Sequence, residues 1–468
     1  MRSIVWFRHN LRLSDNAPLR LAAEQGAVLP VYVHDPALSL FSDTARRVWR
    51  SKSLESLDSS LRSRKNRLFV FQGSTQEILR RMAAHIRAQK IYAYRGLTSE
   101  DRALEDILSG SLAEMGVQLC LTGFDTLFPP DRASEGRSSP WKIFTPYYRF
   151  CRSAFLPEAP LPPPVRVDPC PDFGGLPGET DFRQGETPFL TGLAPGEVGA
   201  MNRLQEFVET ALHGYATWRD FPGEDFTSRL SPHLAAGEIS VREIFWTVQE
   251  SKAPEEDRQK FLEELGWREF SSHLLFHHPE MLVEPLRKEF DSFEWLVDEE
   301  RFAVWSQGRT GIPLVDAGMR ELAQTGWMHN RVRMVVGSFL VKNLGISWQD
   351  GEKWFADHLI DYDPANNAAS WQWVAGCGTD SAPYFRIMNP VLQSQRYDPM
   401  ARYIRRFLPE LSALPDVQVH TLGRCSISKG SALPYRAMDY PEPCVDLTAS
   451  REAALKRYRR IRSTPLMP

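Results

Sequence analysis

Short apolar runs alternate with helical sequence over the first 125 residues, and no other feature of the chain limits its fold as strongly. The runs suit buried strands, and they are Ile4–Phe7, Val28–Val33, Leu68–Phe71, Ile91–Tyr94 and Val117–Leu121. Between two of them Ser74 and Glu77 have the spacing of a capping box, which predicts a helix running to about residue 88. Strands separated by helices form βαβ units, so we expect a Rossmann-like α/β domain with a parallel five-stranded sheet in residues 1–125.

The composition changes twice after this domain. Residues 156–197 hold ten of the 34 prolines, which predicts an extended connector between domains, and we place it at residues 126–198. From about residue 198 apolar residues recur at spacings of three and four, in 201–212, 240–249, 259–276, 314–323 and 331–341. We therefore expect an all-α domain at residues 199–468.

Composition also excludes several classes of protein. No run of about 18 apolar residues occurs, so we expect no membrane span, and the sequence turns polar after Phe7, unlike a signal peptide. The six cysteines have neither CxxC spacing nor nearby histidines, so we expect reduced thiols, no metal site and a cytoplasmic protein. The net charge of −3 disfavours a strongly basic nucleic-acid binder. The run LKRYRRIRSTP is either a local DNA contact or the solvated end of a helix.

Two motifs in the helical half combine residue types that can bind a ligand. The segment 227–232, TSRLSP, places three hydroxyls and an arginine before a helix, which suits a phosphate group but equally an N-cap cluster. Glu264, Trp267 and Arg268 share one helix face, where they could hold a nucleobase or form a surface ion pair beside a half-buried ring.

A third group of residues lies near the end of the helical pattern. Arg331 and Arg333 point to different sides of a helix, so one could meet phosphate while the other pairs internally. The turn DYDPANN holds Asp361 and Asp363 but lacks the EF-hand pattern, so pairing of a buried Asp with Arg is the better interpretation. Ten of the 13 tryptophans lie between residues 218 and 373, many beside polar residues, which suggests a site in addition to core packing.

These motifs stand in two long stretches that together resemble one family. The stretches are TGIPLVDAGMRELAQTGWMHNRVRMVVGSFLVKNLGISWQDGEKWF and DPANNAASWQWVAGCGTDSAPYFRIMNP, and they are similar to the flavin domain of DNA photolyases and cryptochromes. A weaker similarity continues through WFRHNLRLSDN and PWKIFTPYYR in the first half. The wording WQWVAG and GWREFSSHLLF is most similar to the bacterial class III photolyases.

The resemblance implies FAD as the cofactor and assigns residues to it. The residues expected near the FAD are Tyr215, Thr227, Ser228, Arg229, Leu230, Ser231, Arg268, Asn330, Arg333, Asp361, Asp363 and Asn367. Arg333 and Asp361 match an ion pair beside the flavin ring, and Asn367 matches the position facing the flavin N5. That position is Asn in photolyases, Asp in plant cryptochromes and Cys in animal ones, so the resemblance implies an enzyme that holds fully reduced flavin.

The resemblance also implies that damaged DNA is the substrate. A cyclobutane pyrimidine dimer would be flipped out into a pocket whose expected catalytic residues are Glu264, Trp267, Asn330, Met334 and Trp373. The expected DNA contacts are Arg219, Arg331 and Arg386. The tryptophans expected to carry an electron to photo-excited flavin are Trp295, Trp348 and Trp371, in order from the surface inward.

Three alternatives to cyclobutane repair follow from the same resemblance. They are a cryptochrome photoreceptor, a six-four photolyase and a non-catalytic DNA-binding flavoprotein. Asn367 and the intact pocket disfavour the first, a single His before Asn330 disfavours the second, and the retained tryptophans disfavour the third. We expect a monomer without an obligate protein partner.

The antenna site departs from the family pattern. Residues 50–53 and 94–99 lack the His, Asn and Glu that would be expected for a folate or deazaflavin antenna. The antenna therefore differs, binds differently or is absent. If one is bound, we expect 5,10-methenyltetrahydrofolate in preference to deazaflavin.

Overall fold

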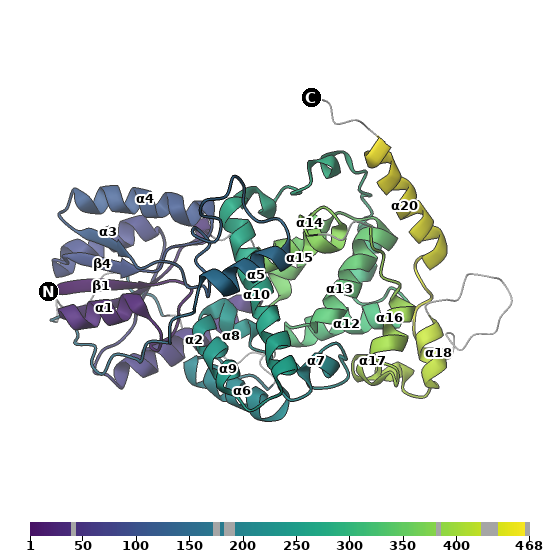
Figure 1. Ribbon diagram of the computed structural model, residues 1–468, viewed down its shortest axis with the longest axis horizontal. Coiled ribbons are helices and arrows are strands. Elements are labelled where there is room, and N and C mark those ends of the chain that lie inside the picture. The colour runs from purple at the N-terminus through teal and green to yellow at the C-terminus, as the bar shows by residue number, and fades with distance from the viewer. Residues whose placement is uncertain (39–43, 172–177, 182–191, 381–384, 423–438, 464–468) are drawn as a thin grey trace. The chain divides into compact units, whose positions relative to one another are not determined.

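The five apolar runs form one parallel sheet, as the sequence predicts. The structure is a computed structural model, and it describes residues 1–38, 44–171, 178–181, 192–380, 385–422 and 439–463. The strands are β1 (Arg2–Phe7), β2 (Ala27–His34), β3 (Phe69–Gln72), β4 (Lys90–Ala93) and β5 (Gln118–Leu121). Their order is β3-β2-β1-β4-β5, so the strands are added outward from β1 to β3, and β4 then pairs with the other edge of β1. Figure 1 shows β4 next to β1.

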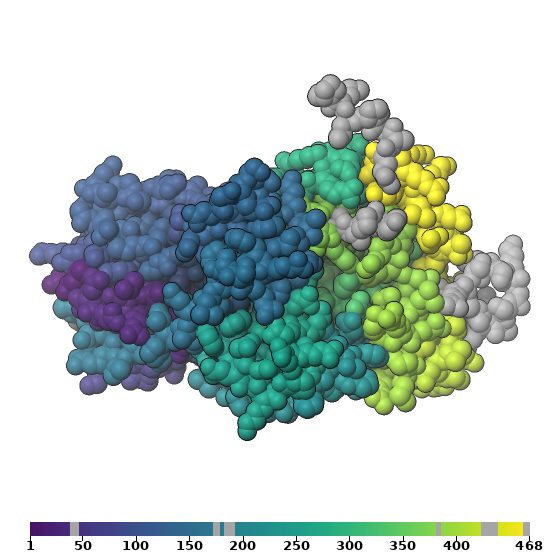
Figure 2. All heavy atoms as spheres, viewed as in Figure 1, coloured from purple at the N-terminus to yellow at the C-terminus, as the bar shows by residue number. Residues whose placement is uncertain are grey.

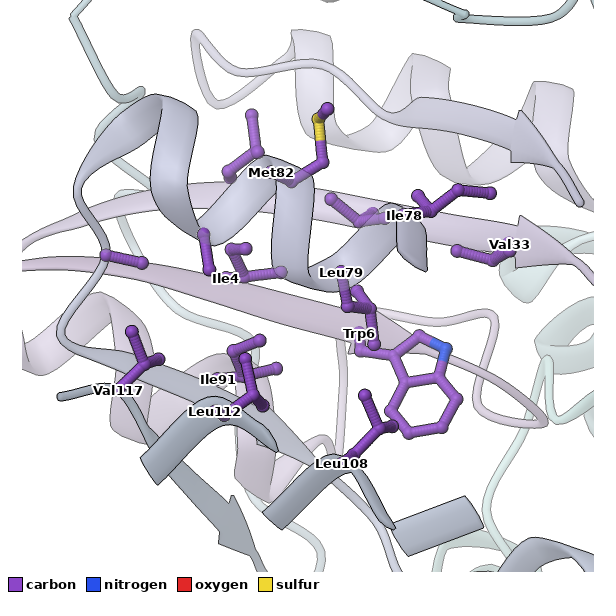
Figure 3. Packing of buried hydrophobic residues seen from close by; sticks show 14 of the residues in the cluster. Ile4, Trp6, Val33, Ile78, Leu79, Met82, Ile91, Leu108, Leu112 and Val117 are labelled. Atoms are coloured by element: carbon purple, nitrogen blue, oxygen red, sulfur yellow. The ribbon is translucent and has the colours of Figure 1, made fainter. Parts of the chain in front are cut away.

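Alternate residues of the strands enter two separate cores, because successive side chains of a strand point to opposite faces. Ile4 and Trp6 of β1 pack with α3 (Thr75–Ile86) and α4 (Ser99–Ala113), as Figure 3 shows. Val5 and Phe7 pack with α1 (Ala17–Gln25) and α2 (Thr44–Arg62) on the other face. The predicted Rossmann-like α/β fold with a parallel five-stranded sheet is therefore confirmed, and its helices cover both faces of the sheet.

Helix caps in this region agree with the sequence in part. Ser74 is the N-cap of α3, and its hydroxyl accepts from the Glu77 N–H at 3.4 Å, as expected. The complete reciprocal capping box is instead recorded at α4, where Thr98 and Asp101 bond each other's backbone. α3 ends at Ile86, because Arg87 adopts the left-handed conformation that stops a helix.

Helices form the rest of the described chain, and no named strand follows β5 in the described ranges. Each of the five periodic segments named from the sequence lies for most of its length on one of the longer helices. In chain order the helices are α5 (Phe144–Ala154), α6 (Glu197–Thr210), α7 (Tyr215–Trp218), α8 (Ser231–Ala236), α9 (Val241–Glu250), α10 (Glu255–His277), α11 (Glu299–Ser306), α12 (Pro313–Thr325), α13 (Asn330–Ser338), a π-helical turn (Phe339–Leu344), α14 (Trp348–His358), α15 (Pro364–Ala375), α16 (Pro390–Tyr397), α17 (Arg402–Phe407), α18 (Asp416–Thr421) and α20 (Leu447–Ser463).

The chain divides into two compact units that do not follow the sequence in simple order. The first unit contains residues 1–213 and 228–279, and the second contains residues 214–227 and 280–468. The predicted division at residues 125 and 198 follows composition, and it stays a prediction about domains. In the described part of the predicted connector, α5 packs on α10 of the first unit through Tyr147 and Phe270, whose ring centroids are 5.1 Å apart.

Two general expectations can be compared with the structure. None of the helices in the described ranges is both long enough and apolar enough to cross a lipid bilayer. The cysteines that the structure describes are free thiols, while Cys425 lies outside the described residues. The basic run near the C-terminus forms most of α20, whose yellow atoms lie on the surface of the second unit in Figure 2.

Candidate functional site

The segment expected to bind phosphate leads directly into a helix of the first unit. Ser228, Arg229 and Leu230 precede α8, and Ser231 is its first residue. Arg229 has a φ of 51°, and the Arg203 Nε donates to the Ser228 carbonyl at 2.7 Å, so the turn is held from α6. Leu230 occupies the N-cap position of α8, and its side chain forms no capping hydrogen bond. The first N–H groups of α8 therefore receive no hydrogen bond from an N-cap side chain.

The three residues of the α10 face lie together in the first unit, as the helical spacing predicts. The Trp267 ring stacks on Phe144 of α5, with centroids 3.7 Å apart and planes 12° apart. Glu264 lies one turn earlier, with a carboxylate oxygen 3.4 Å from the Lys260 Nζ. Phe144 therefore braces the ring, while the Glu264 side chain keeps part of its surface exposed to solvent.

A buried carboxylate beside this face was missed by the sequence reasoning. Glu269 is fully buried and accepts from the Leu127 and Phe128 N–H groups at 2.6 and 3.0 Å. It also accepts from the Arg268 guanidinium at 3.0 Å. Burial raises the pKa of Glu269, against the opposing effect of Arg268. Glu269 thus fixes Arg268 on α10. The sequence signal was weak, because the two backbone donors lie about 140 residues away.

In the second unit, the predicted pairing of a buried Asp with Arg is present. The Arg333 guanidinium of α13 bonds Asp361 at 2.7 Å, and its Nε donates to the Met328 carbonyl at 2.7 Å. Asp361 is 7% exposed, so its carboxylate is largely removed from water. The ion pair joins the start of α13 to the turn before α15.

The second arginine of this motif also has a partner within the second unit, and its expected contact with phosphate stays a prediction. Arg331 forms an ion pair with Asp220, and its guanidinium carbon lies 4.5 Å from the Tyr397 ring centroid. Arg219 lies nearby, with its Nε 3.8 Å from Asp220. The sequence could not reveal the pairing of Asp220 with Arg331, because 111 residues separate them.

α15 presents several predicted site residues from one short helix. Asp363 is its N-cap and accepts from the Asn366 N–H at 2.9 Å. The buried Asn367 amide donates to the Glu352 carbonyl at 3.2 Å and to the Glu352 carboxyl at 3.1 Å. Tyr362 donates to the same carboxyl at 3.1 Å. Glu352 on α14 therefore orients Asn367, a role that no sequence motif indicated.

The start of α13 carries two more of the residues that the sequence assigns to the lesion. Asn330 is exposed and Met334 is half-buried. His329 precedes them as the N-cap, and its Nδ1 accepts from the Arg331 N–H at 3.2 Å. Burial lowers the pKa of His329 to about 3, so the ring is neutral at ordinary pH and its proton lies on Nε2. Tyr215 and Thr227 also belong to this unit, buried and half-buried respectively.

Of the three tryptophans expected to carry an electron, one is more exposed than the other two. Trp371 and Trp348 are buried, and Trp295 is half-buried and packs on Phe293 at 4.4 Å. Trp371 also contacts Phe355, with centroids 5.0 Å apart, and the fully buried Trp305 at 6.4 Å. Trp305 was not singled out from the sequence, because a core tryptophan has the same local pattern.

Two family models match the chain, and they agree with this arrangement. Residues 3–165 match the model described as DNA photolyase, and residues 261–460 match the FAD binding domain of DNA photolyase. Residues 261–460 thus match a flavin-binding domain, and they follow an α/β region that matches the other part of the same family. The chain belongs to the DNA photolyase family, which also confirms the resemblance found in the sequence.

Relatives and solved structures cover nearly the whole chain. A deoxyribodipyrimidine photo-lyase of Agrobacterium fabrum is 39% identical over 98% of both chains. The solved structure of a bacterial class III photolyase from Agrobacterium tumefaciens has a TM-score of 0.92 at 38% identity, covering 99% of this chain and 98% of that one. A cryptochrome from Synechocystis has a TM-score of 0.89 at 31% identity, covering 97% and 99%.

Proposed function

We propose that this protein is a light-dependent DNA repair enzyme that reverses cyclobutane pyrimidine dimers, a deoxyribodipyrimidine photo-lyase. The observation that carries the proposal is the α10 face, where an accessible carboxylate, Glu264, lies one turn from a braced ring, Trp267. The names of the full-length relatives support the same activity.

The residues assigned to FAD suit its chemistry. The uncapped start of α8 and the hydroxyls of Ser228 and Ser231 provide the neutral donors that a pyrophosphate requires. Tyr215, Thr227, Arg229, Leu230 and Arg268 would complete the phosphate and ribityl contacts. The Arg333–Asp361 pair, Asp363 and Asn330 would line the flavin ring, with Asn367 at its N5 edge. When bound, FAD in its reduced form supplies an electron to the dimer after absorbing blue light.

The protein's own residues would bind and orient the damaged strand. Photolyases belong to the enzymes that take their target base out of the duplex, and a dimer stacks poorly, which lowers the cost of this step. Trp267 and Trp373 would pack against the extruded dimer, Glu264 would accept or donate at its base edge, and Asn330 and Met334 would line the remaining wall. Arg219, Arg331 and Arg386 would contact phosphates, which makes the affinity dependent on salt.

Trp295, Trp348 and Trp371 would restore reduced flavin from the surface of the protein. Trp295 is half-buried whereas Trp348 and Trp371 are both buried, which is compatible with an inward electron path. A chain that only bound DNA would not need such a path.

An antenna chromophore, if the protein carries one, would be methenyltetrahydrofolate in preference to deazaflavin. The two segments considered for it are occupied by internal bonds: Ser53 bonds the carbonyl of Trp49 at 2.9 Å, and the Tyr94 hydroxyl donates to the Asp15 carbonyl at 3.2 Å. Mass spectrometry of the chromophores released from purified protein would identify it, and flavin alone would remove the antenna from the proposal.

The experiment that tests the repair function uses photoreduced holoprotein and an oligonucleotide with one thymine dimer. Blue light should restore thymine absorbance, and a dark sample should not change. Glu264→Ala and Trp267→Ala should lose most of this recovery. Glu263→Ala is the matched control, because this neighbouring glutamate also pairs with Lys260 but is not assigned to the pocket.

Absence of recovery in photoreducible wild-type holoprotein would contradict the proposal. A cryptochrome photoreceptor would then be the better function, since the Synechocystis cryptochrome shares the fold. A six-four lesion would be the next substrate tried.

A further inference from the structure

Lys342 is a buried amine that the proposed chemistry does not use. It is 0% exposed and lies in the π-helical turn Phe339–Leu344, between α13 and α14. Lysine is almost never fully buried without a counter-ion, and π-helical turns occur often at functional sites. Within the described residues no carboxylate forms a salt bridge with Lys342, and burial lowers the pKa of its amine well below the usual value.

Two neutral groups take the place of the counter-ion. The Nζ donates to the carbonyl of Ala375, the last residue of α15. The same nitrogen lies 3.0 Å from the centroid of the Phe385 ring, so an N–H group meets the negative face of the ring. Lys342 thereby joins the end of α15 to the segment that begins at Phe385.

The other face of Phe385 is covered by α20. The Tyr458 ring stacks on it with centroids 4.3 Å apart and planes 10° apart. A nitrogen at 3.0 Å and a ring stacked at 4.3 Å cannot share one face, so Phe385 is held between Lys342 and Tyr458. Gly376 allows this approach, because a Cβ there would lie 3.3 Å from Phe385 and 3.5 Å from the Lys342 Nζ.

The two segments that Lys342 joins carry two of the residues assigned to damaged DNA. Arg386 follows Phe385 directly, and Trp373 lies in the last turn of α15, two residues before Ala375. The Arg386 guanidinium carbon is 6.0 Å from the Trp373 ring centroid. The relative position of this ring and this guanidinium therefore depends on the contacts of Lys342.

We infer that Lys342 is a positioning residue for lesion recognition: with Tyr458 it clamps Phe385, and so sets Arg386 against Trp373. The inference rests on the proposed repair function and extends it to residues that touch neither DNA nor cofactor. It predicts an effect on the discrimination between damaged and undamaged DNA, and not on the electron transfer that follows.

The first test is Lys342→Met in the FAD-loaded full chain, since methionine keeps an unbranched side chain that is one atom shorter and removes the amine. Affinity for an oligonucleotide with one thymine dimer should fall about tenfold, as expected for loss of one central recognition contact. Affinity for the undamaged oligonucleotide should fall much less, because only the phosphate contact of Arg386 is shared with it. The repair rate at saturating damaged DNA and the rate of flavin photoreduction should stay as in the wild type. Lys353→Met is the matched control, because Lys353 is an exposed lysine on α14.

A second pair of variants changes Tyr458 on α20 and leaves the buried Lys342 amine in place. Tyr458→Ala should weaken binding of the damaged oligonucleotide selectively, and Tyr458→Phe, which keeps the stacked ring, should not. This pair decides the question if Lys342→Met does not fold.

Unchanged affinity for the dimer in Tyr458→Ala and in folded Lys342→Met would overturn the inference. Equal weakening for damaged and undamaged DNA would also overturn it, because the clamp would then act on the fold in general. These failures are distinct from failure of the proposed function, which would show as absence of light-dependent repair by the wild type.

Discussion

Asn367 shows how much of a site residue's role depends on a partner far away in the sequence. The family position of Asn367 could be identified from the motif DPANNAASWQW, but its hydrogen bonds to Glu352 could not. The same holds for Arg331 with Asp220 and for Lys342 with Phe385. Sequence periodicity reports which side of a helix a residue occupies, whereas these partners depend on tertiary packing.

Asn367→Asp should destabilise the protein, because it replaces an amide donor with a carboxyl group beside the buried Glu352 carboxyl. We expect the free energy of unfolding at pH 8 to fall by about 2 kcal/mol, the usual cost of unsatisfied buried groups, and the loss to be smaller at pH 5. Urea unfolding measures both values. Asn366→Asp is the control, since a carboxylate in the first turn of α15 is favourable. Equal stability of the Asn367 variant and the wild type at pH 8 would contradict the role of Glu352.

His273 should make the protein sensitive to acid. It is fully buried on α10, and burial, with a smaller contribution from His277, lowers its pKa to about 3. An unfolded histidine has a pKa of about 6.5, so between pH 6.5 and 3 the unfolded chain binds more protons than the folded one. The stabilisation is complete above pH 6.5 and is lost as the pH falls towards 3.

His273→Phe tests this coupling, because the ring fits among Tyr147 and Phe270 without titrating. The free energy of unfolding between pH 6 and 4 should depend less steeply on pH, by about 1.4 kcal/mol per pH unit, which corresponds to one proton. Denaturant titrations at several pH values measure the slope. The exposed His213→Phe should leave it unchanged, and an unchanged slope in His273→Phe would show that another group causes the acid sensitivity.

Among the elements, α15 combines a structural cap with a site. The sequence predicted a turn, DYDPANN, at its start. The hydrogen bond that Asp363 accepts from the Asn366 N–H also makes this residue the N-cap of α15, a role independent of flavin. Strand and helix positions were predicted well, because alternating and three-to-four spacings follow directly from backbone geometry. Helix ends such as Ile86 and the π-helical turn at 339–344 were not, since local backbone conformation decides them.

Asp363→Ala should cost about 1 kcal/mol of stability through loss of the N-cap, and it should also weaken FAD retention. Asp363→Asn keeps the accepting oxygen and removes the charge, so its stability should stay near that of the wild type. Thermal unfolding and flavin fluorescence separate the two effects. If Asp363→Asn is as unstable as Asp363→Ala, the charge and not the cap stabilises α15.

For the whole molecule, the sequence predicted the order of α/β and helical regions but not the composition of the two compact units. Residues 228–279 pack with the first unit: the Trp49 indole donates to Glu238 at 3.1 Å, and Arg242 pairs with Asp15 at 2.7 Å. Such long-range pairs leave no local signal, so a boundary drawn from proline content at residue 198 could not reveal them.

A fragment of residues 1–198 should therefore be unstable, although it ends at the predicted boundary. It lacks the partners of the buried Trp49 and Asp15, so it should bind hydrophobic dye and unfold without a cooperative transition. A fragment of residues 1–279 should unfold cooperatively. Near-ultraviolet circular dichroism during heating compares them, and equally cooperative unfolding of the shorter fragment would show that residues 228–279 contribute little.

The interleaving of the two units has a consequence for synthesis on the ribosome. The first unit has all of its residues only after Pro279 has left the exit tunnel. By then residues 214–227 have already emerged, while the rest of their unit, from Glu280 onward, is still inside the tunnel or not yet translated. The nascent chain must hold this short segment without its partners until residues 280–468 emerge, so Tyr215 and its neighbours form a segment that a chaperone would protect during translation.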